Sequence, residues 1–579
     1  MIRDHFRVLV ADVSTGRGTV VLEDGRDEVA GGSGLAARLF ARYGRPEAPW
    51  DHPDQPLILA IGPLTGAFPL MSKTVFAFKS PYHDQYTESH AGGRSALALR
   101  FADLDALVIV GRAASTSFLD IGSRHFKLRS AGFLAGMEVQ ESGRLLRRMT
   151  PGSGHRTILR IGPAGERMVP MANINVDTYR HFGRMGGGAA LGAKRLKAVV
   201  IGGDADFHLP EGKTYNDLFA GVYATVTARG MMKKYHDLGT AANLESLDDL
   251  RSLPWRNLQA TSDPAIDRIS GQEFADRTLL RNSACAGCPV GCIHVGYVRE
   301  RFMDEHRFLY RQVAYDYEPI FALGSMLGVT DTAAVLKLLD AAEQAGLDAM
   351  STGVALAWAT EASEQGLVGP QQTIEPLAFG DSIGLLRAIR HLAGAVNPFY
   401  AALGRGTLAA SREYGGAEFA CVLGQEMAGY ATGETFFAAQ SLGFRHSHLD
   451  TGAYGYDQQH ADRNLDKAVR FLVDDEAGRV VLTSMVACLF ARSVYTDEVL
   501  GECLASLGCA RLAGDLDALG ARVQQLRWRM RLATGFTPAA ITIPKRFFRV
   551  TTWKGPIDGA YLEQLQAAYG QAILALAGT

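Results

Sequence analysis

The stretch Gly186-Gly187-Gly188-Ala189-Ala190-Leu191-Gly192, with the apolar run Ala198-Val199-Val200-Ile201 behind it, carries the pattern that decides the fold of the first 205 residues. A glycine-rich turn opens an alanine-rich helix, and an apolar strand follows the helix. The same order occurs at residues 31–61 and again at residues 92–110. No repeat of sequence is evident beyond this order. The pattern predicts recurring supersecondary structure in a mixed α/β region that is rich in sheet.

Beyond about residue 212 the apolar residues recur at helical spacing. The stretch 331–346 places Val335, Leu338 and Ala342 on one face, and Gly346 is a suitable helix stop. Segments with the same spacing follow at 213–228, 353–366, 383–395, 403–414, 465–473, 480–493 and 512–534. We therefore predict an α+β protein in three parts, with a β-rich part at 1–205 and mostly helical parts at 206–405 and 406–579.

Composition excludes several function classes. The chain has 579 residues, and its 59 Lys and Arg against 61 Asp and Glu give a net charge of −2. A dedicated nucleic-acid binder is normally more basic, so we expect no nucleic-acid partner. No apolar run approaches the roughly 18 residues of a membrane-spanning helix, so we expect no membrane span. The first residues lack an apolar signal core, and the expected location is the cytoplasm.

Three of the seven cysteines crowd into one loop, Asn282-Ser283-Ala284-Cys285-Ala286-Gly287-Cys288-Pro289-Val290-Gly291-Cys292. This C-x2-C-x3-C spacing suits an iron–sulfur cluster, which needs four thiolates. The fourth would come from Cys421, Cys488, Cys503 or Cys509. A zinc site also takes four ligands and accepts C-x2-C, and buried free thiols are a third interpretation.

Other polar groups are ambiguous on sequence alone. Helix N-termini at the glycine turns could bind phosphates, with Lys73, Arg94 and Arg184 nearby, or the glycines could serve close packing. The two histidines in Arg445-His446-Ser447-His448-Leu449-Asp450 could relay protons, ligate a metal or lie in a surface loop. Glu318 precedes the apolar run 319–323, so it is either a helix-terminal charge or a base whose pKa is raised by desolvation.

Further motifs occur in a fixed order along nearly the whole chain. They are Ala60-Ile61-Gly62-Pro63-Leu64-Thr65-Gly66, Lys79-Ser80-Pro81, Ala91-Gly92-Gly93, Ile161-Gly162-Pro163-Ala164-Gly165-Glu166, Gly183-Arg184-Met185-Gly186-Gly187-Gly188, the cysteine loop, Tyr317-Glu318, Gly346-Leu347-Asp348 and Pro544-Lys545-Arg546-Phe547. With these motifs the whole chain resembles the aldehyde:ferredoxin oxidoreductases, a family of tungsten–pterin enzymes.

The resemblance implies an N-terminal domain of two β-sheets that forms a base for the cofactor, covered by two mostly helical domains. It implies tungsten, less often molybdenum, held by two pterins (a bis-molybdopterin), with Mg²⁺ between their phosphates. It implies a 4Fe–4S cluster on Cys285, Cys288, Cys292 and Cys488, with Cys488 on an apolar helix. The residues that match the family's cofactor contacts are Lys73, His90, Gly92, Gly93, Arg94, Arg184, Gly186, Gly187, Gly188, Glu343, Gly346, Leu347, Asp348 and Thr483.

The chain departs from the family pattern at several of these positions. The two D-x-x-G-L-[CD] motifs begin here with Glu343 and Thr483, and His90 replaces an asparagine on the magnesium side. Lys337 and Asp340 stand where the best-known member has an iron site between subunits, so we expect no such iron. The family's active-site histidine has no ungapped counterpart, and His446 or His448 could take its place.

By resemblance, the expected reaction is the two-electron oxidation of an aldehyde to a carboxylic acid, with Glu318 as base and His448 as proton relay or substrate contact. Electrons would pass through the cluster to ferredoxin or an iron–sulfur subunit, and the chain could form a homodimer or a hetero-oligomer. Two alternatives remain open. One is the reductive catalytic subunit of an aromatic acyl-CoA (benzoyl-CoA type) reductase, and the other is a non-catalytic electron-transfer subunit that has lost the pterin.

Overall fold

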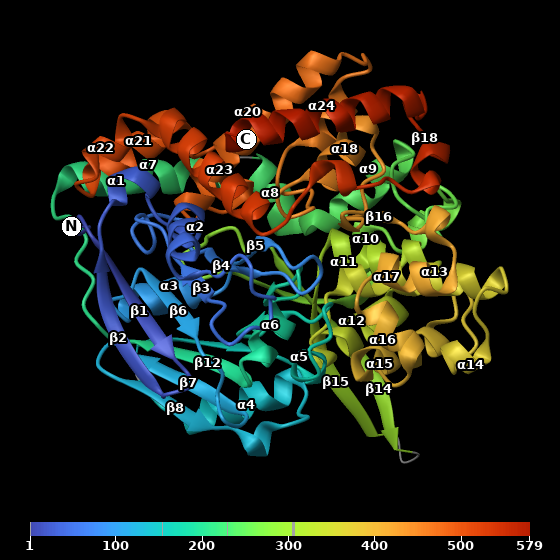
Figure 1. Ribbon diagram of the computed structural model, residues 1–579, viewed down its shortest axis with the longest axis horizontal. Helices are drawn as coiled ribbons and strands as arrows, with labels where there is room; N and C mark the ends of the chain where they lie inside the picture. Colours follow the sequence, from blue (N-terminus) through green and yellow to red (C-terminus); the bar gives the residue numbers. More distant parts are fainter. Residues whose placement is uncertain (1, 153, 229, 304–306, 579) are drawn as a thin grey trace.

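Two six-stranded sheets make up the first 203 residues of this computed structural model, which describes residues 2–152, 154–228, 230–303 and 307–578 (Figure 1). The first sheet contains β1 (Phe6–Asp12), β2 (Arg17–Glu23), β3 (Leu57–Ala60), β4 (Thr74–Lys79), β5 (Tyr86–Ala91) and β6 (Ala106–Val110). The second contains β7 (Ser117–Gly122), β8 (Phe126–Ser130), β9 (His155–Arg160), β10 (Ile174–Val176), β11 (Arg180–Phe182) and β12 (Leu196–Gly203).

The two sheets have the same topology. Their strand orders are β2-β1-β6-β3-β4-β5 and β8-β7-β12-β9-β10-β11. Each sheet begins with a hairpin whose first strand, β1 or β7, pairs in parallel with the last strand, β6 or β12, as in Val8↔Ala106 and Phe118↔Ala198. The other pairings are antiparallel. The N-terminal part is therefore a structural duplication. Leu59-Ala60-Ile61-Gly62-Pro63 and Leu159-Arg160-Ile161-Gly162-Pro163 occupy matching places after β3 and β9, and this is the sequence trace of the repeat that we missed.

Side chains alternate between the two faces of the first sheet. Leu57 and Leu59 of β3 belong to a core shared with residues of the second sheet, such as Leu159 and Ile201. Ile58 and Ala60 face the other way, into the main core that includes helix α2 (Gly32–Tyr43). This period-two alternation is expected of strands that are buried on both faces. The sheets thus pack on each other and also against helices.

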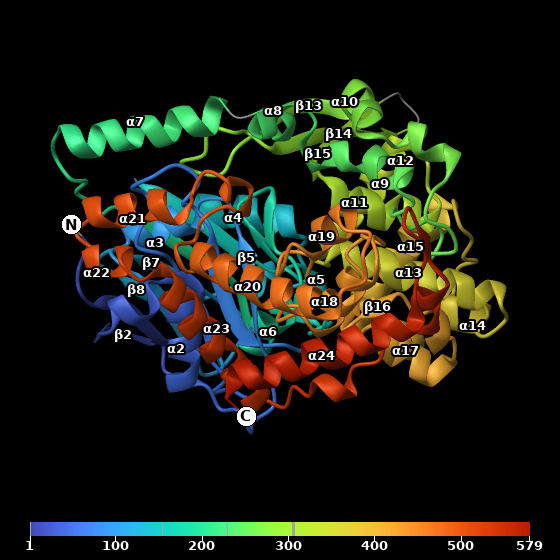
Figure 2. The same cartoon turned by 90° about the horizontal axis from the view of Figure 1, so that it is seen from above.

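Helices cover the sheets and form most of the remainder of the chain (Figures 1 and 2). The remainder also contains a three-stranded sheet and two small hairpins, β16 (Val422–Leu423) with β17 (Gln425–Glu426) and β18 (Thr551–Thr552) with β19 (Gly555–Pro556). The glycine turns lead into α2, α3 (Ser95–Phe101) and α6 (Gly187–Ala193) as predicted. The longer helices that follow are α7 (Lys213–Ala228), α8 (Gly230–Asp237), α10 (Gly271–Thr278), α12 (Thr332–Ala345), α13 (Ala349–Glu364), α15 (Ser382–Gly394), α17 (Thr407–Tyr414), α18 (Glu434–Leu442), α20 (Leu465–Ser484), α21 (Asp497–Ser506), α23 (Leu516–Ala533) and α24 (Gly559–Ala577).

The structure corrects the sequence prediction in three places. A three-stranded antiparallel sheet, β13 (Leu279–Ser283), β14 (Ile293–Met303) and β15 (Arg307–Tyr315), lies in the part that we expected to be helical. The predicted segment 403–414 is divided between α16 (Pro398–Gly404) and α17. The predicted segments 465–473 and 480–493 merge into α20, which ends at Ser484. Cys488 therefore lies beyond the helix, at the N-cap of a 3₁₀ turn, and not on an apolar helix.

No single helix among the described residues has the length and apolar composition needed to cross a membrane. Only Tyr317–Leu327 and Thr332–Ala345 taken together reach that length and composition, and the two segments are bent by 111°.

Candidate cofactor and active site

The four cysteines of the predicted cluster come together in space. Cys285, Cys288 and Cys292 lie on the loop between β13 and β14, and Cys488 follows α20. Leu70 joins the two segments, because its N–H donates to Gly287 O (3.2 Å) and its carbonyl accepts from Cys488 N–H (2.9 Å). Burial, with added repulsion from Cys488 and the other loop thiols, raises the pKa of Cys288 to about 12. The four thiols therefore lie close enough for their charges to act on one another.

Two cations face these thiols. Arg180 Nη2 donates to Cys292 Sγ at 3.5 Å, and Lys73 Nζ lies 3.6 Å from the place where a Cβ on Gly92 would project. Burial alone would raise the pKa of Cys285, but Arg180, Lys73 and the Gly93 N–H together lower it. We had not predicted Arg180 as a site residue. Its role depends on the approach of β11 to the cysteine loop, which no local pattern of the sequence reveals.

The thiols are not arranged as ligands of one ion. Within the described residues, no three His, Cys, Asp or Glu side chains converge as the ligands of a single metal ion would. Zinc binds four ligands at one centre, whereas a cubane cluster spreads its four thiolates around a larger group. The 4Fe–4S cluster stays a prediction, which rests on the C-x2-C-x3-C spacing and on the nearness of Cys488 to this loop. Of the other cysteines, buried Cys421 donates to Asn257 O (3.4 Å), and Cys503 and Cys509 are buried as well.

Close packing is one reason for the glycines at 186–188. The Gly188 N–H donates to Ala172 O (2.9 Å), and a Cβ on Gly188 would lie 2.2 Å from Asn173 O. Gly186 has φ +84, a conformation that favours glycine, and a Cβ on Gly187 would lie 3.0 Å from Phe76. The Gly188 N–H is thus engaged within the protein, and phosphate binding at this turn stays a prediction.

The glycines at 92 and 93 lie against the cysteine loop. A Cβ on Gly92 would lie 2.7 Å from Cys285 Sγ, and Gly93 O accepts from Ala286 N–H at 3.0 Å. Their position fits contact with a cluster better than contact with a phosphate. Arg94 is an exposed residue at the N-cap of α3 with no side-chain hydrogen bond among the described residues, and its contact with the cofactor stays a prediction.

The ends of α12 and α20 sit at equivalent places on the duplicated sheets. A Cβ on Gly162 would lie 2.3 Å from Ala345 O, and a Cβ on Gly62 would lie 2.4 Å from Met485 O. Each site is the glycine of an Ile-Gly-Pro segment, and each receives the end of a helix that carries one of the family's two pterin motifs. The duplication therefore offers two matching ligand sites.

Unsatisfied polar atoms surround the motif 343–348. Buried atoms without a partner among the described residues include Asn173 Oδ1, Asn175 Oδ1, Arg184 Nη1 and Glu426 Oε2. Buried polar groups are normally hydrogen-bonded, so these atoms are suited to contact a polar ligand. A tungsten–pterin cofactor is a group of this kind, and this side fits it.

Within the motif 343–348, residues 346–348 make structural contacts, whereas Glu343 is a buried titratable group. Leu347 O accepts from Asn173 Nδ2 (2.8 Å), and Asp348 caps α13 and lies 3.5 Å from Arg184 Nε. Gly346, at φ +75, ends α12 as predicted. Burial, with repulsion from Asp340 and Asp316, raises the pKa of Glu343 well above its usual range. This shift favours the protonated form of Glu343, which can both donate and accept a hydrogen bond.

The motif 483–488 presents a different set of groups. Thr483 Oγ1 lies 3.0 Å from Ser33 Oγ, which donates to Glu88 Oε2 at 2.8 Å. The buried carboxylate of Glu88 is thus linked through Ser33 to Thr483, the position at which the family has an aspartate. Arg527 also pairs with Glu88 at 2.9 Å. Ser484 Oγ and Thr87 Oγ1 are buried without partners among the described residues, so this side also fits a polar ligand.

The His90 side chain is not free to bind a magnesium ion. Its Nε2 lies 3.0 Å from Glu88 Oε2, and its Nδ1 lies 3.1 Å from Arg445 Nη1. Burial and the charge of Arg445 lower the pKa of His90 to about 4, so the ring is neutral. Both ring nitrogens are engaged within the protein. Contact of His90 with the cofactor stays a prediction, but in this arrangement its ring is not a metal ligand.

Glu318, His448 and Tyr430 form one hydrogen-bonded group at the start of α11 (Tyr317–Leu323). Glu318 Oε1 lies 3.0 Å from His448 Nε2 and accepts from Tyr430 OH at 2.9 Å. The rings of Tyr430 and His448 lie 5.0 Å apart, and Tyr454 stacks on Tyr430 at 4.9 Å. The structure thus brings together the carboxylate and one of the two predicted histidines. Tyr430 is an addition that the sequence did not single out.

The pKa of Glu318 is opposite to our expectation. Burial would raise it, but hydrogen bonds from His448 and Tyr430 and the charge of His448 lower it. Asp316, two residues earlier, instead has a pKa raised to about 7 by burial and by Glu318, against the pull of Arg180 and Lys73. Two nearby carboxyl groups with separated pKa values can serve as base and acid.

His446 lies in a different environment from His448. Its Nδ1 faces Gln440 O (3.1 Å) and its Nε2 faces Arg531 Nη2 (2.6 Å). Burial, together with Arg531 and His83, lowers the pKa of His446 well below its usual range. Because both ring nitrogens are engaged away from Glu318, the structure does not support His446 as a catalytic group.

The comparisons with known proteins agree with this arrangement. Residues 8–203 match the family model "Aldehyde ferredoxin oxidoreductase, N-terminal domain", and residues 219–572 match "Aldehyde ferredoxin oxidoreductase, domains 2 & 3". The chain is 28% identical to the tungsten-containing aldehyde ferredoxin oxidoreductase of Pyrococcus furiosus, over 94% of this chain and 92% of that protein. It is also 28% identical to the enzyme of that name from Thermococcus kodakarensis, over 96% and 93%.

A solved structure, the active site complex BamBC of benzoyl coenzyme A reductase in complex with 1,5-dienoyl-CoA, has the same fold. Its TM-score is 0.82 at 18% identity, and the match covers 98% of this chain and 95% of that one. Together, the two family matches span most of the sequence. The chain therefore belongs to the aldehyde ferredoxin oxidoreductase family of tungsten-containing oxidoreductases.

Proposed function

We propose that this chain oxidises an aldehyde to a carboxylic acid with a tungsten–pterin cofactor. The reaction takes up one water, releases two protons and removes two electrons from the substrate. The single observation that carries the proposal is the group Glu318, His448 and Tyr430, which joins a carboxylate of lowered pKa to an imidazole and a phenol hydroxyl in a buried place. The names of the relatives support aldehydes as the substrate class.

Glu318 is the base in this proposal. Its lowered pKa keeps it ionised at neutral pH, so it can accept a proton from the attacking water. His448 Nε2 contacts the same carboxylate oxygen, and its Nδ1 is buried without a partner among the described residues. A ring with one engaged and one free nitrogen can pass a proton onward or hold a substrate oxygen. Tyr430 fixes the carboxylate from the other side.

Asp316 supplies the complementary acid. Its pKa, raised to about 7, suits it to donate a proton near neutral pH. Arg180 and Lys73 act on the charges of both Asp316 and the cysteine loop, so these two cations lie between the proton-transfer residues and the thiols. The bound tungsten–pterin group would accept the two electrons from the substrate.

Named residues would hold the cofactors. Cys285, Cys288, Cys292 and Cys488 would bind a 4Fe–4S cluster, which passes single electrons to ferredoxin or to an iron–sulfur subunit. Asn173, Arg184 and Glu343 would bind one pterin, and Ser484 with the Ser33–Glu88 pair would face the other. A Mg²⁺ between the pterin phosphates would be bound without help from the His90 ring.

A second candidate function is the reduction of an aromatic acyl thioester. Tyr317 and Tyr454 pack against Tyr430 beside Glu318, each with its ring centroid 4.9 Å from that of Tyr430. Tyr454 is stacked on Tyr430, and Tyr317 is tilted from it by 39°. Flat aromatic walls suit a planar substrate, which is a property of aromatic aldehydes and of aromatic acyl thioesters alike. The BamBC likeness supports the fold of such a subunit and carries no more than that.

One anaerobic experiment tests both candidates. The metal content of the purified protein is measured first, and tungsten near one atom per chain is required by either reaction. Aliphatic and aromatic aldehydes are then offered with an oxidised viologen dye, and benzoyl-CoA is offered with the reduced dye. Dye reduction by aldehydes supports the main proposal. Tungsten-loaded protein that consumes benzoyl-CoA and leaves every aldehyde untouched would replace it with the second.

A further inference from the structure

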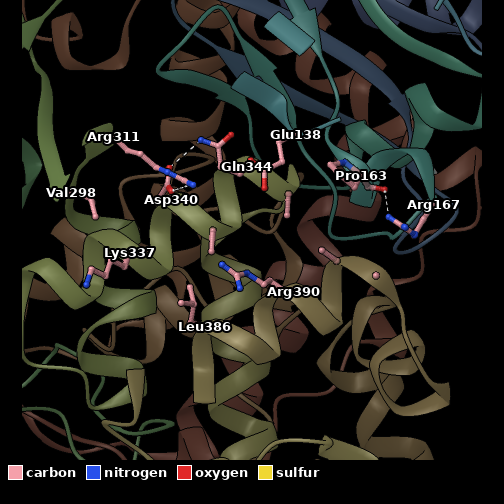
Figure 3. A pocket seen from close by; sticks show the side chains of 14 residues that line it. Glu138, Pro163, Arg167, Val298, Arg311, Lys337, Asp340, Gln344, Leu386 and Arg390 are labelled. Atoms are coloured by element: carbon pink, nitrogen blue, oxygen red, sulfur yellow. Dashed lines mark hydrogen bonds and ion pairs between the residues drawn. The ribbon is translucent and has the colours of Figure 1, made fainter. Parts of the chain in front are cut away.

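A pocket of about 270 Å³ opens in the seam between the sheet part and the helical part of the chain (Figure 3). Helices α4 (Val139–Met149) and α5 (Pro163–Glu166) border it on one side, and α12, α15, β14 and β15 border it on the other. It lies apart from the Glu318 group, since none of Glu318, His448 or Tyr430 lines it. The volume is at the lower end of what small-molecule sites show, which indicates a compact ligand.

Positive charge dominates this pocket. Four cationic side chains line it, Arg167, Arg311, Lys337 and Arg390, against only two acids, Glu138 and Asp340. Both carboxylate oxygens of Asp340 already accept hydrogen bonds, because Arg311 Nη1 donates to Oδ2 at 2.6 Å and Gln344 Nε2 donates to Oδ1 at 3.1 Å. Burial raises the pKa of Glu138, although Arg311 and Arg390 oppose this rise. Three cations therefore face one remaining acid.

Two of these cations are free to bind a ligand. Within the described residues, neither the Lys337 ammonium nor the Arg390 guanidinium makes a hydrogen bond or an ion pair, whereas Arg167 donates to Pro163 O at 3.5 Å. Figure 3 shows Arg311, Arg390 and Arg167 placed around the space, with Lys337 at its edge. Guanidinium groups match the geometry of phosphoryl oxygens, and an ammonium adds a point charge.

We propose that this pocket binds a small phosphoryl anion of diphosphate size. Arg390 and Lys337 hold its oxygens from α15 and α12, and Arg167 contacts it from the N-terminal part. Because the ligand contacts both parts of the chain, it joins them across the seam. The proposal does not depend on the reaction at Glu318, since it rests only on residues that line this pocket.

The test is isothermal titration calorimetry of the purified holoenzyme with inorganic pyrophosphate, without added Mg²⁺ and at constant ionic strength. One saturable site per chain is expected. Removal of a charged hydrogen-bonding group costs binding of at least about tenfold, so Arg390→Ala and Lys337→Ala should each weaken the affinity by that factor. Citrate is the second ligand, and it should bind more weakly because its carboxylates are splayed apart.

Arg387→Ala is the matched control. Arg387 lies on the same helix, α15, but pairs with Glu375 at 3.0 Å and does not line the pocket, so its loss removes equal charge and should leave pyrophosphate affinity unchanged. Lys337 and Arg390 are exposed, and their variants should keep the parent melting temperature. Absence of saturable pyrophosphate binding, or equal loss in the Arg387 and Arg390 variants, would overturn the proposal. Tighter binding of citrate would assign the pocket to carboxylates instead and would also overturn it.

Discussion

Glu318 Oε1 lies 3.0 Å from His448 Nε2, although 130 residues separate the two in the chain. We therefore propose His448, and not His446, as the counterpart of the family's active-site histidine. Glu318→Gln keeps the shape of the side chain and removes the base. A general base contributes typically about 10²–10⁴-fold, so dye-linked aldehyde oxidation should fall by about that factor.

The Glu318 variant has internal controls. Tungsten and iron contents should stay at parent values, because no cofactor contact is assigned to Glu318. His448→Ala should lower turnover, whereas His446→Ala should leave Glu318 and its hydrogen bonds in place, because His446 faces Gln440 and Arg531. Parent turnover by Glu318→Gln with any genuine substrate would refute its role as base.

Tyr430→Phe should move the acid limb of the pH profile. The Tyr430 hydroxyl donates to the ionised form of Glu318 at 2.9 Å and so lowers the Glu318 pKa. Its removal favours the protonated carboxyl, and the pKa should rise by about one unit, since hydrogen bonds to charged groups contribute about 1.5–3 kcal/mol. As the solution is acidified, the variant should therefore lose its activity at a higher pH than the parent enzyme does. The measurement is kcat/KM against pH, and a shift toward lower pH would contradict this assignment.

Local patterns were enough to predict the order of the elements. The glycine turn, helix and strand near residues 186–203, and the helix that ends at Gly346, follow from short-range periodicity and from the conformational freedom of glycine. The β14–β15 hairpin was missed because its polar and charged residues, such as Arg299 and Glu300, conceal the alternation of a half-exposed strand. The duplication of the sheets was missed because only the Ile-Gly-Pro segments preserve it in sequence.

The site was harder to predict than the fold. Tyr430 and Arg180 reach their partners across 112 residues, and nothing beside them in the sequence marks them as functional. The direction of the Glu318 pKa shift was predicted wrongly for the same reason. Desolvation could be inferred from the apolar run after Glu318, but the hydrogen bonds that outweigh it come from another part of the chain.

Cys488→Ser should lose cluster iron, and Cys503→Ala should not. Cys488 is tied to the cysteine loop through Leu70, while Cys503 is buried in α21 and no interaction of its thiol with the loop is seen in the described residues. A cubane cluster requires four ligands, so loss of one thiolate reduces its occupancy. Iron analysis and electron paramagnetic resonance of the reduced proteins measure the effect. Four iron atoms and an unchanged spectrum in the Cys488 variant would exclude Cys488 as a ligand.

Arg180→Gln should lower the midpoint potential of the cluster. Arg180 donates to Cys292 and its charge acts on Cys285, and both effects favour the more negative, reduced state. Loss of about one hydrogen bond's free energy corresponds to a shift on the order of 50 mV for a one-electron couple. Arg180→Lys keeps the charge and should shift the potential less. Redox titration followed by electron paramagnetic resonance provides the comparison, and a rise in potential would count against the contact.

Gly162→Ala should destabilise the fold, whereas Gly183→Ala should not. A Cβ at Gly162 would lie 2.3 Å from Ala345 O and 2.7 Å from Gly346 N, both backbone atoms that cannot move aside as a side chain can. The end of α12 would have to shift away from the sheet, and such overpacking costs typically about 1–3 kcal/mol. Gly183 has open space around its Cβ position, with no heavy atom within 4 Å, so alanine fits there in the protein without cofactors. Thermal unfolding of the cofactor-free proteins should therefore separate the two variants. Equal melting temperatures would mean that the helix end adapts to the extra methyl group and that the contact between the repeated Ile-Gly-Pro segment and α12 is not a fixed part of the seam.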